Sequence, residues 1–244
     1  SSSILVVIGL YVRLKLAEAP IFVTDLDKPQ PKTLPMVEVI ITHFKPFFLG
    51  MLICIAGYVL FYIIIAFSQI YAKSAPSQSE AGYAMGLGFS PQIFTALLMY
   101  SAVSLAISIT ISGKCIDKIG RRIWLIWTTV AVAIFGLALP YFLENGTTVS
   151  LFWFLIIGMG LIGMGYGPLS SFLPELFPTH VRYTGASLTY NIAGLFGASV
   201  AAIIALPLNA NYGLKGVGIY LTLNAVLSLI GLWFITETRD RQLL

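Results

Sequence analysis

A short charged segment, Gly113 to Arg122, has the residue types with the clearest capacity for chemistry. One carboxylate, Asp117, stands among lysines and arginines, and the segment ends in Arg121 and Arg122. The glycines Gly113 and Gly120 favour a tight reversal of the chain. Asp117 can cap or pair with a helix N-terminus, and the arginines can bind carboxylates or helix carboxyl ends. The segment predicts ion pairs that form and break, although an ordinary charged turn would have the same composition.

A second charged segment, Pro174 to Gly185, has residues that could pair with the first. Glu175 and Arg182 could complete an ion network with the aspartate and the two arginines of the first segment. Such a network could form and break as helices rock against one another. His180, in the same segment, is interpreted as a solvated loop residue rather than as a ligand or a proton relay.

Five polar side chains stand inside otherwise apolar stretches, and they are the candidates for binding a solute. Tyr58 and Tyr62 are i,i+4 neighbours on one face of a predicted helix, and Gln69 continues that face. Tyr166 and Asn191 belong to two later stretches. Phenols and amides hydrogen-bond carboxylates, hydroxyls or amines. Hydrogen bonding between helices is the alternative role for all five.

The spacings that enzymes and metal sites require are missing from the sequence. We find no nucleophile–base pairing, no metal-ligand spacing of His, Cys and Glu, and no phosphate-binding loop in a polar context. Gly158 to Gly163 match the pattern GxGxxG, but they lie in an uncharged stretch, where small residues indicate close helix packing. Cys54 and Cys115 should lie at different depths, so no disulfide is expected. We therefore expect no catalytic residue, no cofactor and no metal site.

The chain is 58% hydrophobic and only 10% charged. Most of it therefore consists of apolar runs of helical length, and these runs must position the residues described above. Soluble domains have about 25% charged residues. A helix of about 20 residues crosses the roughly 30 Å hydrocarbon layer of a membrane. The predicted spans are Pro46–Ala72, Pro91–Ser112, Ile123–Phe142, Val149–Phe172, Thr184–Leu206 and Gly216–Thr236.

The distribution of basic residues predicts the orientation. Nearly all lysines and arginines lie in alternate loops, and the loops on the other side hold only Lys73 and Lys215. This asymmetry places both ends of the bundle in the cytoplasm. It also explains the net charge of +4 without nucleic-acid binding, since the basic residues are dispersed. No acidic or basic residue lies deep in a span, so a proton-coupling acid would have to lie elsewhere.

Four regions are expected along the chain. Residues 1–12 are interpreted as the end of a preceding transmembrane helix, which would make the chain a fragment. Residues 13–45 are a proline-containing cytoplasmic loop. Its last part, Leu34–Lys45, is either an amphipathic helix at the membrane interface or a solvated linker with a frayed helix. Residues 46–236 form the six-helix bundle, and residues 237–244 form a cytoplasmic tail.

The charged segments resemble the major facilitator superfamily of transporters. Gly113–Arg122 is similar to the loop signature of that superfamily in its second-half copy. Glu175–Gly185, with the following residues through Asn191, resembles the metabolite:proton symporter branch, which includes transporters of shikimate, 2-oxoglutarate, citrate and proline or betaine. The resemblance extends from about residue 4 to Arg239. Ala202 departs from it, because members of the branch often have proline there. Further similar positions, at the exit from the sixth helix, are Arg13, Glu18, Pro20 and Phe22.

The resemblance implies an all-α integral membrane protein, the second half of a twelve-helix fold in the plasma membrane with its C-terminus in the cytoplasm. Its partners would be the bilayer, a missing N-terminal six-helix half, a small-molecule substrate and protons. It implies proton-coupled alternating access for an organic acid or a zwitterion. The alternatives are a proton-driven drug exporter of the same superfamily and a non-transporting membrane scaffold or sensor subunit.

Overall fold

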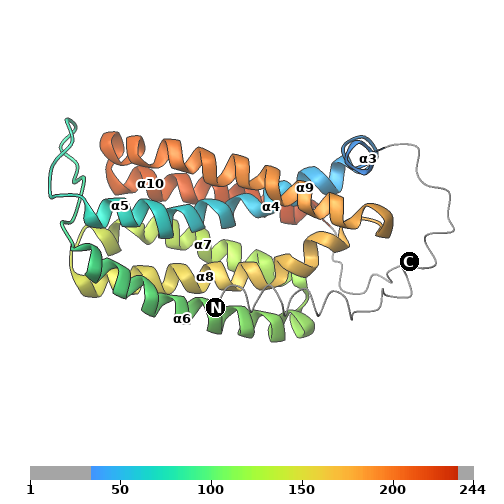
Figure 1. Ribbon diagram of the computed structural model, residues 1–244, viewed down its shortest axis with the longest axis horizontal. Helices are drawn as coiled ribbons and strands as arrows, with labels where there is room; N and C mark the ends of the chain where they lie inside the picture. The colour runs from blue at the N-terminus through green and yellow to red at the C-terminus, as the bar shows by residue number, and fades with distance from the viewer. Residues whose placement is uncertain (1–33, 236–244) are drawn as a thin grey trace, which may run out of the picture. The chain divides into compact units, whose positions relative to one another are not determined.

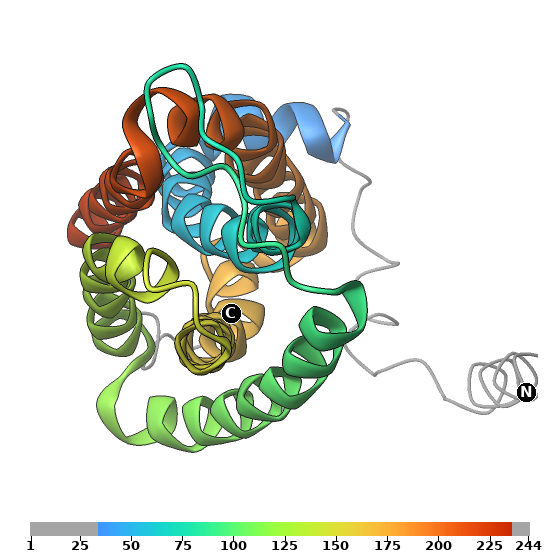
Figure 2. The same cartoon turned by 90° about the vertical axis from the view of Figure 1, so that its left-hand side faces the viewer.

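The computed structural model describes residues 34–235. The chain divides into two compact units, Ser1–Pro35 and Met36–Leu244, and the helical bundle lies within the second (Figures 1 and 2). The expectations for residues 1–12 and 237–244, for most of 13–45, and for Arg13, Glu18, Pro20 and Phe22 lie outside the described residues.

The described residues are almost entirely helical (Figure 1). Two π-helical turns and a 3₁₀ turn interrupt the α-helices. The elements are α3 (Pro35–Thr42), α4 (Phe44–Tyr62), the π turn η1 (Ile63–Phe67), α5 (Ser68–Lys73), α6 (Pro91–Ile119), α7 (Arg121–Leu143), α8 (Thr148–Glu175), the 3₁₀ turn η2 (Thr179–Val181), α9 (Arg182–Gly194), the π turn η3 (Leu195–Ser199) and α10 (Val200–Phe234).

Five helical segments in residues 34–235 are long and apolar enough to cross a membrane. The last, Thr179–Phe234, has 56 residues and would be about 84 Å long if straight. Gly213, with φ of 67° and ψ of −170°, breaks it inside α10. This segment therefore supplies both of the last two predicted spans. The all-helical membrane fold expected from the sequence is confirmed.

The reversal between α6 and α7 differs from the expectation. Gly113 lies inside α6 and is exposed, so it forms no turn. Gly120 alone reverses the chain, with φ of 99° and ψ of 148°, a conformation that glycine adopts without strain. The apolar run ends at Ser112, but the helix continues to Ile119 and ends at Gly120.

Two hydrophobic clusters fill the bundle. The first contains buried side chains such as Val59, Phe135 and Phe154. The second joins α3 to the loop after α8 through residues such as Val39 and Phe177. Burying these apolar side chains against one another, rather than against lipid, gives close packing and not a hydrophobic gain.

Glycines and serines bring α6 and α8 into close contact. A Cβ atom added to Gly163 would lie 2.6 Å from the carbonyl oxygen of Leu105 and 2.9 Å from Ser108 Cβ. The Ser104 hydroxyl donates to the carbonyl oxygen of Ile156 at 2.9 Å. These contacts confirm that the GxGxxG pattern serves helix packing, as the uncharged stretch predicts.

A pair of glycine substitutions tests this packing. Gly163→Ala should lower the free energy of unfolding by about 1–3 kcal/mol, because the added methyl group meets the α6 backbone. Gly113→Ala should raise it by about 0.5–1 kcal/mol, because its Cβ would meet nothing within 4 Å and alanine favours a helix. Denaturant titration of the purified protein in detergent measures both changes. Equal effects of the two substitutions would contradict the packing role.

Candidate functional site

A cavity of about 170 Å³ lies between α4, α7, α8 and α9. It is located where the two hydrophobic clusters meet, since its walls include Val132 of the first and Ile53 of the second. No Asp, Glu, Lys or Arg lines it among residues 34–235. The polar groups on its walls come from the thiol of Cys54, the hydroxyls of two threonines, and three tyrosines.

The three tyrosines form one cluster at this cavity. Tyr190 on α9 donates its hydroxyl hydrogen to the hydroxyl oxygen of Tyr166 on α8, at 3.0 Å. The rings of Tyr58 on α4 and Tyr190 have centroids 4.9 Å apart. The cluster therefore places phenol hydroxyls and aromatic faces around one uncharged space.

Glycines determine where the cavity is open and where helices touch. A Cβ atom on Gly57 would meet nothing within 4 Å, and one on Gly165 would meet only Thr128 Cγ2 at 3.9 Å. Both glycines line the cavity, so their missing side chains leave its space free. In contrast, a Cβ on Gly197 would lie 2.6 Å from Tyr58 Cβ. This glycine allows η3 to pack directly against Tyr58.

A second cavity, of about 230 Å³, adjoins the first. The two share Tyr166, Leu169 and Tyr190 as lining residues. The second cavity extends toward the end of α8, where Pro174 lines it. The hydrogen bond between Tyr166 and Tyr190 thus stands at the boundary between the two spaces.

Two of the five predicted solute-binding residues, Tyr58 and Tyr166, meet at the cavity. Tyr62 instead donates to the carbonyl oxygen of Ala202 at 3.4 Å, so it takes the interhelical role. Asn191 is exposed and donates to the carbonyl oxygen of Ser187 on its own helix, at 2.7 Å. Gln69 is exposed beyond η1. The π turn inserts about one extra residue and so rotates Gln69 away from the face of Tyr58 and Tyr62.

Of the three tyrosines at the cavity, Tyr190 is the one that was not predicted from the sequence. It directly precedes Asn191, which we selected in its place. One position on a helix corresponds to a rotation of about 100°, so the choice between the two depends on how α9 is turned. An aromatic ring with a single hydroxyl suits a mainly apolar wall better than an amide does. This preference for an aromatic ring is the signal in the sequence that could have identified Tyr190.

Among the described residues, an ion pair joins the two charged segments at the end of the bundle. Arg121, the first residue of α7, pairs through its guanidinium with the carboxylate of Glu175, the last residue of α8. Both side chains are largely buried, with 22% and 16% of their surface exposed. A cation at a helix N-terminus and an anion at a C-terminus each oppose the dipole of their own helix. The pair offsets this cost and joins α7 to α8.

The other predicted network residues have different contacts. Arg122 donates from Nε to the carbonyl oxygen of Leu232 at 2.8 Å and from Nη2 to that of Trp233 at 3.0 Å. It therefore binds the carboxyl end of α10, where a cation is favoured. Arg182 makes longer contacts within its own loop, and its Nη2 lies 3.4 Å from Thr179 Oγ1. Asp117 is exposed and forms no ion pair with any residue of 34–235.

Comparison with known proteins gives consistent results. The family described as "Sugar (and other) transporter" matches residues 77–244. A putative metabolite transport protein of Haemophilus influenzae is 85% identical, over 100% of this chain and 54% of that protein. The inner membrane metabolite transport protein YhjE of Escherichia coli is 38% identical, over 99% and 54%. A proline/betaine transporter of Salmonella typhimurium is 26% identical, over 97% and 47%.

The chain spans about half the length of the curated relatives it matches. No solved structure matches it. The family match covers most of the chain, including the helices from α6 onward and both charged segments. Together with the long apolar helices, it confirms the resemblance seen in the sequence. The chain belongs to the sugar (and other) transporter family of the major facilitator superfamily, and it is a multi-pass integral membrane protein of a family of transporters rather than enzymes.

Proposed function

We propose that this chain forms one half of a secondary active transporter that moves a small polar metabolite by proton-coupled alternating access. The substrate is an organic acid or a zwitterion. The observation that carries the proposal is the uncharged cavity with Tyr58, Tyr166 and Tyr190 on its wall, inside a bundle of membrane-spanning helices. Such a cavity is concave and mostly apolar with few polar groups, which is typical of a small-molecule site.

The chemistry of the cavity favours a zwitterion. Phenol hydroxyls can donate hydrogen bonds to a carboxylate, and aromatic faces attract a cation placed over them. The ring faces of Tyr58 and Tyr190 and the hydroxyl of Tyr166 offer both kinds of contact within one space. The names of relatives, such as the proline/betaine transporter of Salmonella typhimurium, agree with this class. Tyr62, Gln69 and Asn191 line neither cavity and would contact solute only in another access state.

A second six-helix half would complete the transporter. Substrates of this fold bind near the midplane between the two halves, and the relatives are about twice as long as this chain. The N-terminal half would supply the opposite wall of the site. The protein would lie in the plasma membrane with its C-terminus in the cytoplasm, as the alternate basic loops predict.

The N-terminal half would also supply the group that couples transport to protons. Intramembrane carboxylates usually mark proton relays. In the described bundle the acidic side chains, such as Glu38, Glu80 and Glu144, lie at the ends of helices or in loops. Proton-coupled transport by this chain alone would contradict this assignment.

The ion pair at the end of the bundle would stabilise one access state. Arg121 and Glu175 hold α7 to α8 in the present arrangement. Asp117, exposed here, would pair in the alternative arrangement, and Gly120 would let the α6–α7 turn adjust. Arg122 would anchor the carboxyl end of α10. Arg182 would anchor the α8–α9 loop.

Solute uptake tests the proposal. Membrane vesicles containing the native polypeptide that includes this chain should take up proline, betaine or an organic acid with saturation, and an uncoupler should stop the accumulation. Efflux of many unrelated apolar compounds would favour the drug-exporter alternative instead. The absence of any saturable flux would contradict the transporter proposal and favour the scaffold alternative.

A further inference from the structure

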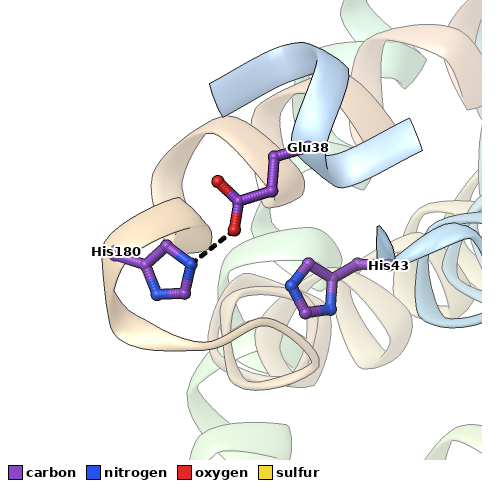
Figure 3. A group of neighbouring side chains, drawn as sticks. All are labelled: Glu38, His43 and His180. Carbon is purple, nitrogen blue, oxygen red and sulfur yellow. Dashed lines mark hydrogen bonds and ion pairs between the residues drawn. The ribbon is translucent and has the colours of Figure 1, made fainter. Parts of the chain in front are cut away.

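The two histidines of the chain meet beside a glutamate at one end of the bundle (Figure 3). Glu38 comes from α3, His43 from the junction between α3 and α4, and His180 from η2. Glu38 and His180 are 142 positions apart in the sequence. Because no other histidine exists in 244 residues, their meeting at one carboxylate is not a consequence of a histidine-rich surface.

The donor atoms of these three side chains are close enough to share one ion. His180 Nε2 and Glu38 Oε1 are 2.7 Å apart, and one donor atom from each residue lies within 4.8 Å of the others. Figure 3 shows a ring nitrogen of His43 turned toward His180. The two imidazole rings have centroids 6.4 Å apart at an angle of 64°.

A metal ion would require only small movements of these side chains. Bonds of about 2.1 Å in a tetrahedral site put the donor atoms about 3.4 Å apart. The separations of up to 4.8 Å exceed this by a distance that rotation of the histidine rings can close. His180 is exposed enough to rotate, with 51% of its side-chain surface accessible.

The backbone around the three residues is held in place by buried neighbours. Val39 follows Glu38, Val181 follows His180, and both valines are buried in the same hydrophobic cluster. The amide of His43 donates to the carbonyl oxygen of Val39 at 3.1 Å, so the junction between α3 and α4 is also defined. The site is therefore preorganised by packing, which is what a ligand set needs to bind with affinity.

We propose that Glu38, His43 and His180 bind a divalent transition-metal ion, for which Zn²⁺ is the best match. Two imidazoles and one carboxylate are the ligands of open zinc sites, in which water occupies the fourth position. Mg²⁺ and Ca²⁺ prefer oxygen ligands only. The bound ion would join α3 to the loop between α8 and α9. In the described residues the hydrogen bond between Glu38 and His180 and the packing of the two valines already link these elements.

Co²⁺ binding to the purified chain tests this proposal directly. The chain is prepared in detergent with an affinity tag that contains no histidine, and Co²⁺ is titrated while its visible absorption is recorded. We expect the absorption of a tetrahedral site, one ion per chain, which an equal amount of Zn²⁺ removes. Zn²⁺ should also raise the melting temperature.

Substitutions separate this site from adventitious binding. His43→Ala and His180→Ala should each weaken Co²⁺ binding at least about 100-fold, and Glu38→Gln should weaken it as well. Glu80→Gln, at an exposed glutamate in another loop, is the matched control and should change nothing. If an alanine variant misfolds, His180→Gln takes its place as the test, and circular dichroism checks that its helix content is unchanged. Absence of Co²⁺ absorption in the unsubstituted chain, or its retention in both histidine variants, would overturn the proposal.

Discussion

Replacing Tyr190 with phenylalanine should weaken solute binding at least about tenfold, measured as a rise in the KM for uptake. The substitution removes the hydroxyl that donates to Tyr166 at 3.0 Å but keeps the ring that packs on Tyr58. In the proposed site the Tyr166 hydroxyl donates to the solute carboxylate, and Tyr190 orients that hydroxyl. A hydrogen bond to a charged group contributes about 1.5–3 kcal/mol, and 1.4 kcal/mol corresponds to a factor of ten, so losing the orientation of Tyr166 is expected to have this effect. The hydroxyl of Tyr166 would also lose its neighbour and become free to rotate.

Two further substitutions show whether the effect belongs to the cavity. Tyr183→Phe, on the same helix and 75% exposed, removes a hydroxyl outside both cavities and should leave uptake unchanged. Gly57→Leu should abolish uptake without loss of stability, because its side chain would enter the open space. Gly113→Leu, at a helical glycine that also has open space beside it but lines neither cavity, is its control. An unchanged KM for Tyr190→Phe together with normal uptake by Gly57→Leu would exclude this cavity as the solute site.

Breaking the pair between Arg121 and Glu175 should change the transport rate at least about tenfold while membrane insertion stays normal. Arg121→Gln leaves the largely buried carboxylate of Glu175 without this partner at a helix C-terminus, where negative charge is unfavourable. The access state that contains the pair is then destabilised. A change of 1.4 kcal/mol between two states alters their ratio tenfold.

The thiol of Cys54 provides a readout of this shift that does not depend on transport. Cys54 is buried on the wall of the cavity, so its labelling rate in a Cys115→Ser background reports how often the cavity opens. Arg121→Gln should raise that rate, and the exchange Arg121→Glu with Glu175→Arg should restore it in part. Unchanged labelling and normal uptake would remove the gating role from the pair.

Asp117→Asn tests whether Asp117 stabilises the alternative access state rather than the present one. Asp117 has no ion pair in the described residues, so its substitution should leave the stability of the present arrangement unchanged. If Asp117 pairs only in the alternative arrangement, Asp117→Asn should slow transport and lower Cys54 labelling, opposite to Arg121→Gln. Normal uptake kinetics in Asp117→Asn would contradict its proposed part in gating.

The membrane fold could be predicted from the sequence because the information that specifies it is local. Apolar length decides whether a helix can span the bilayer, and basic loops predict its orientation. Tyr58 and Tyr166 could be selected for the same reason, since each is a polar group inside an apolar span. Arg121 and Arg122 could be assigned to carboxylates and helix carboxyl ends, because those are the acceptors that the end of a bundle offers.

Which of these residues meet depends on the way the helices pack in three dimensions. Tyr190 rather than Asn191 reaches the cavity because of the rotation of α9, and the π turn η1 moves Gln69 off the face of Tyr58. These choices depend on packing between helices, which no local pattern in the sequence records. The same holds for His43 and His180, which come from distant segments and meet because buried valines beside Glu38 and His180 pack in one cluster. Contacts between distant segments are set by how complete helices fit together, and hydropathy does not encode that fit.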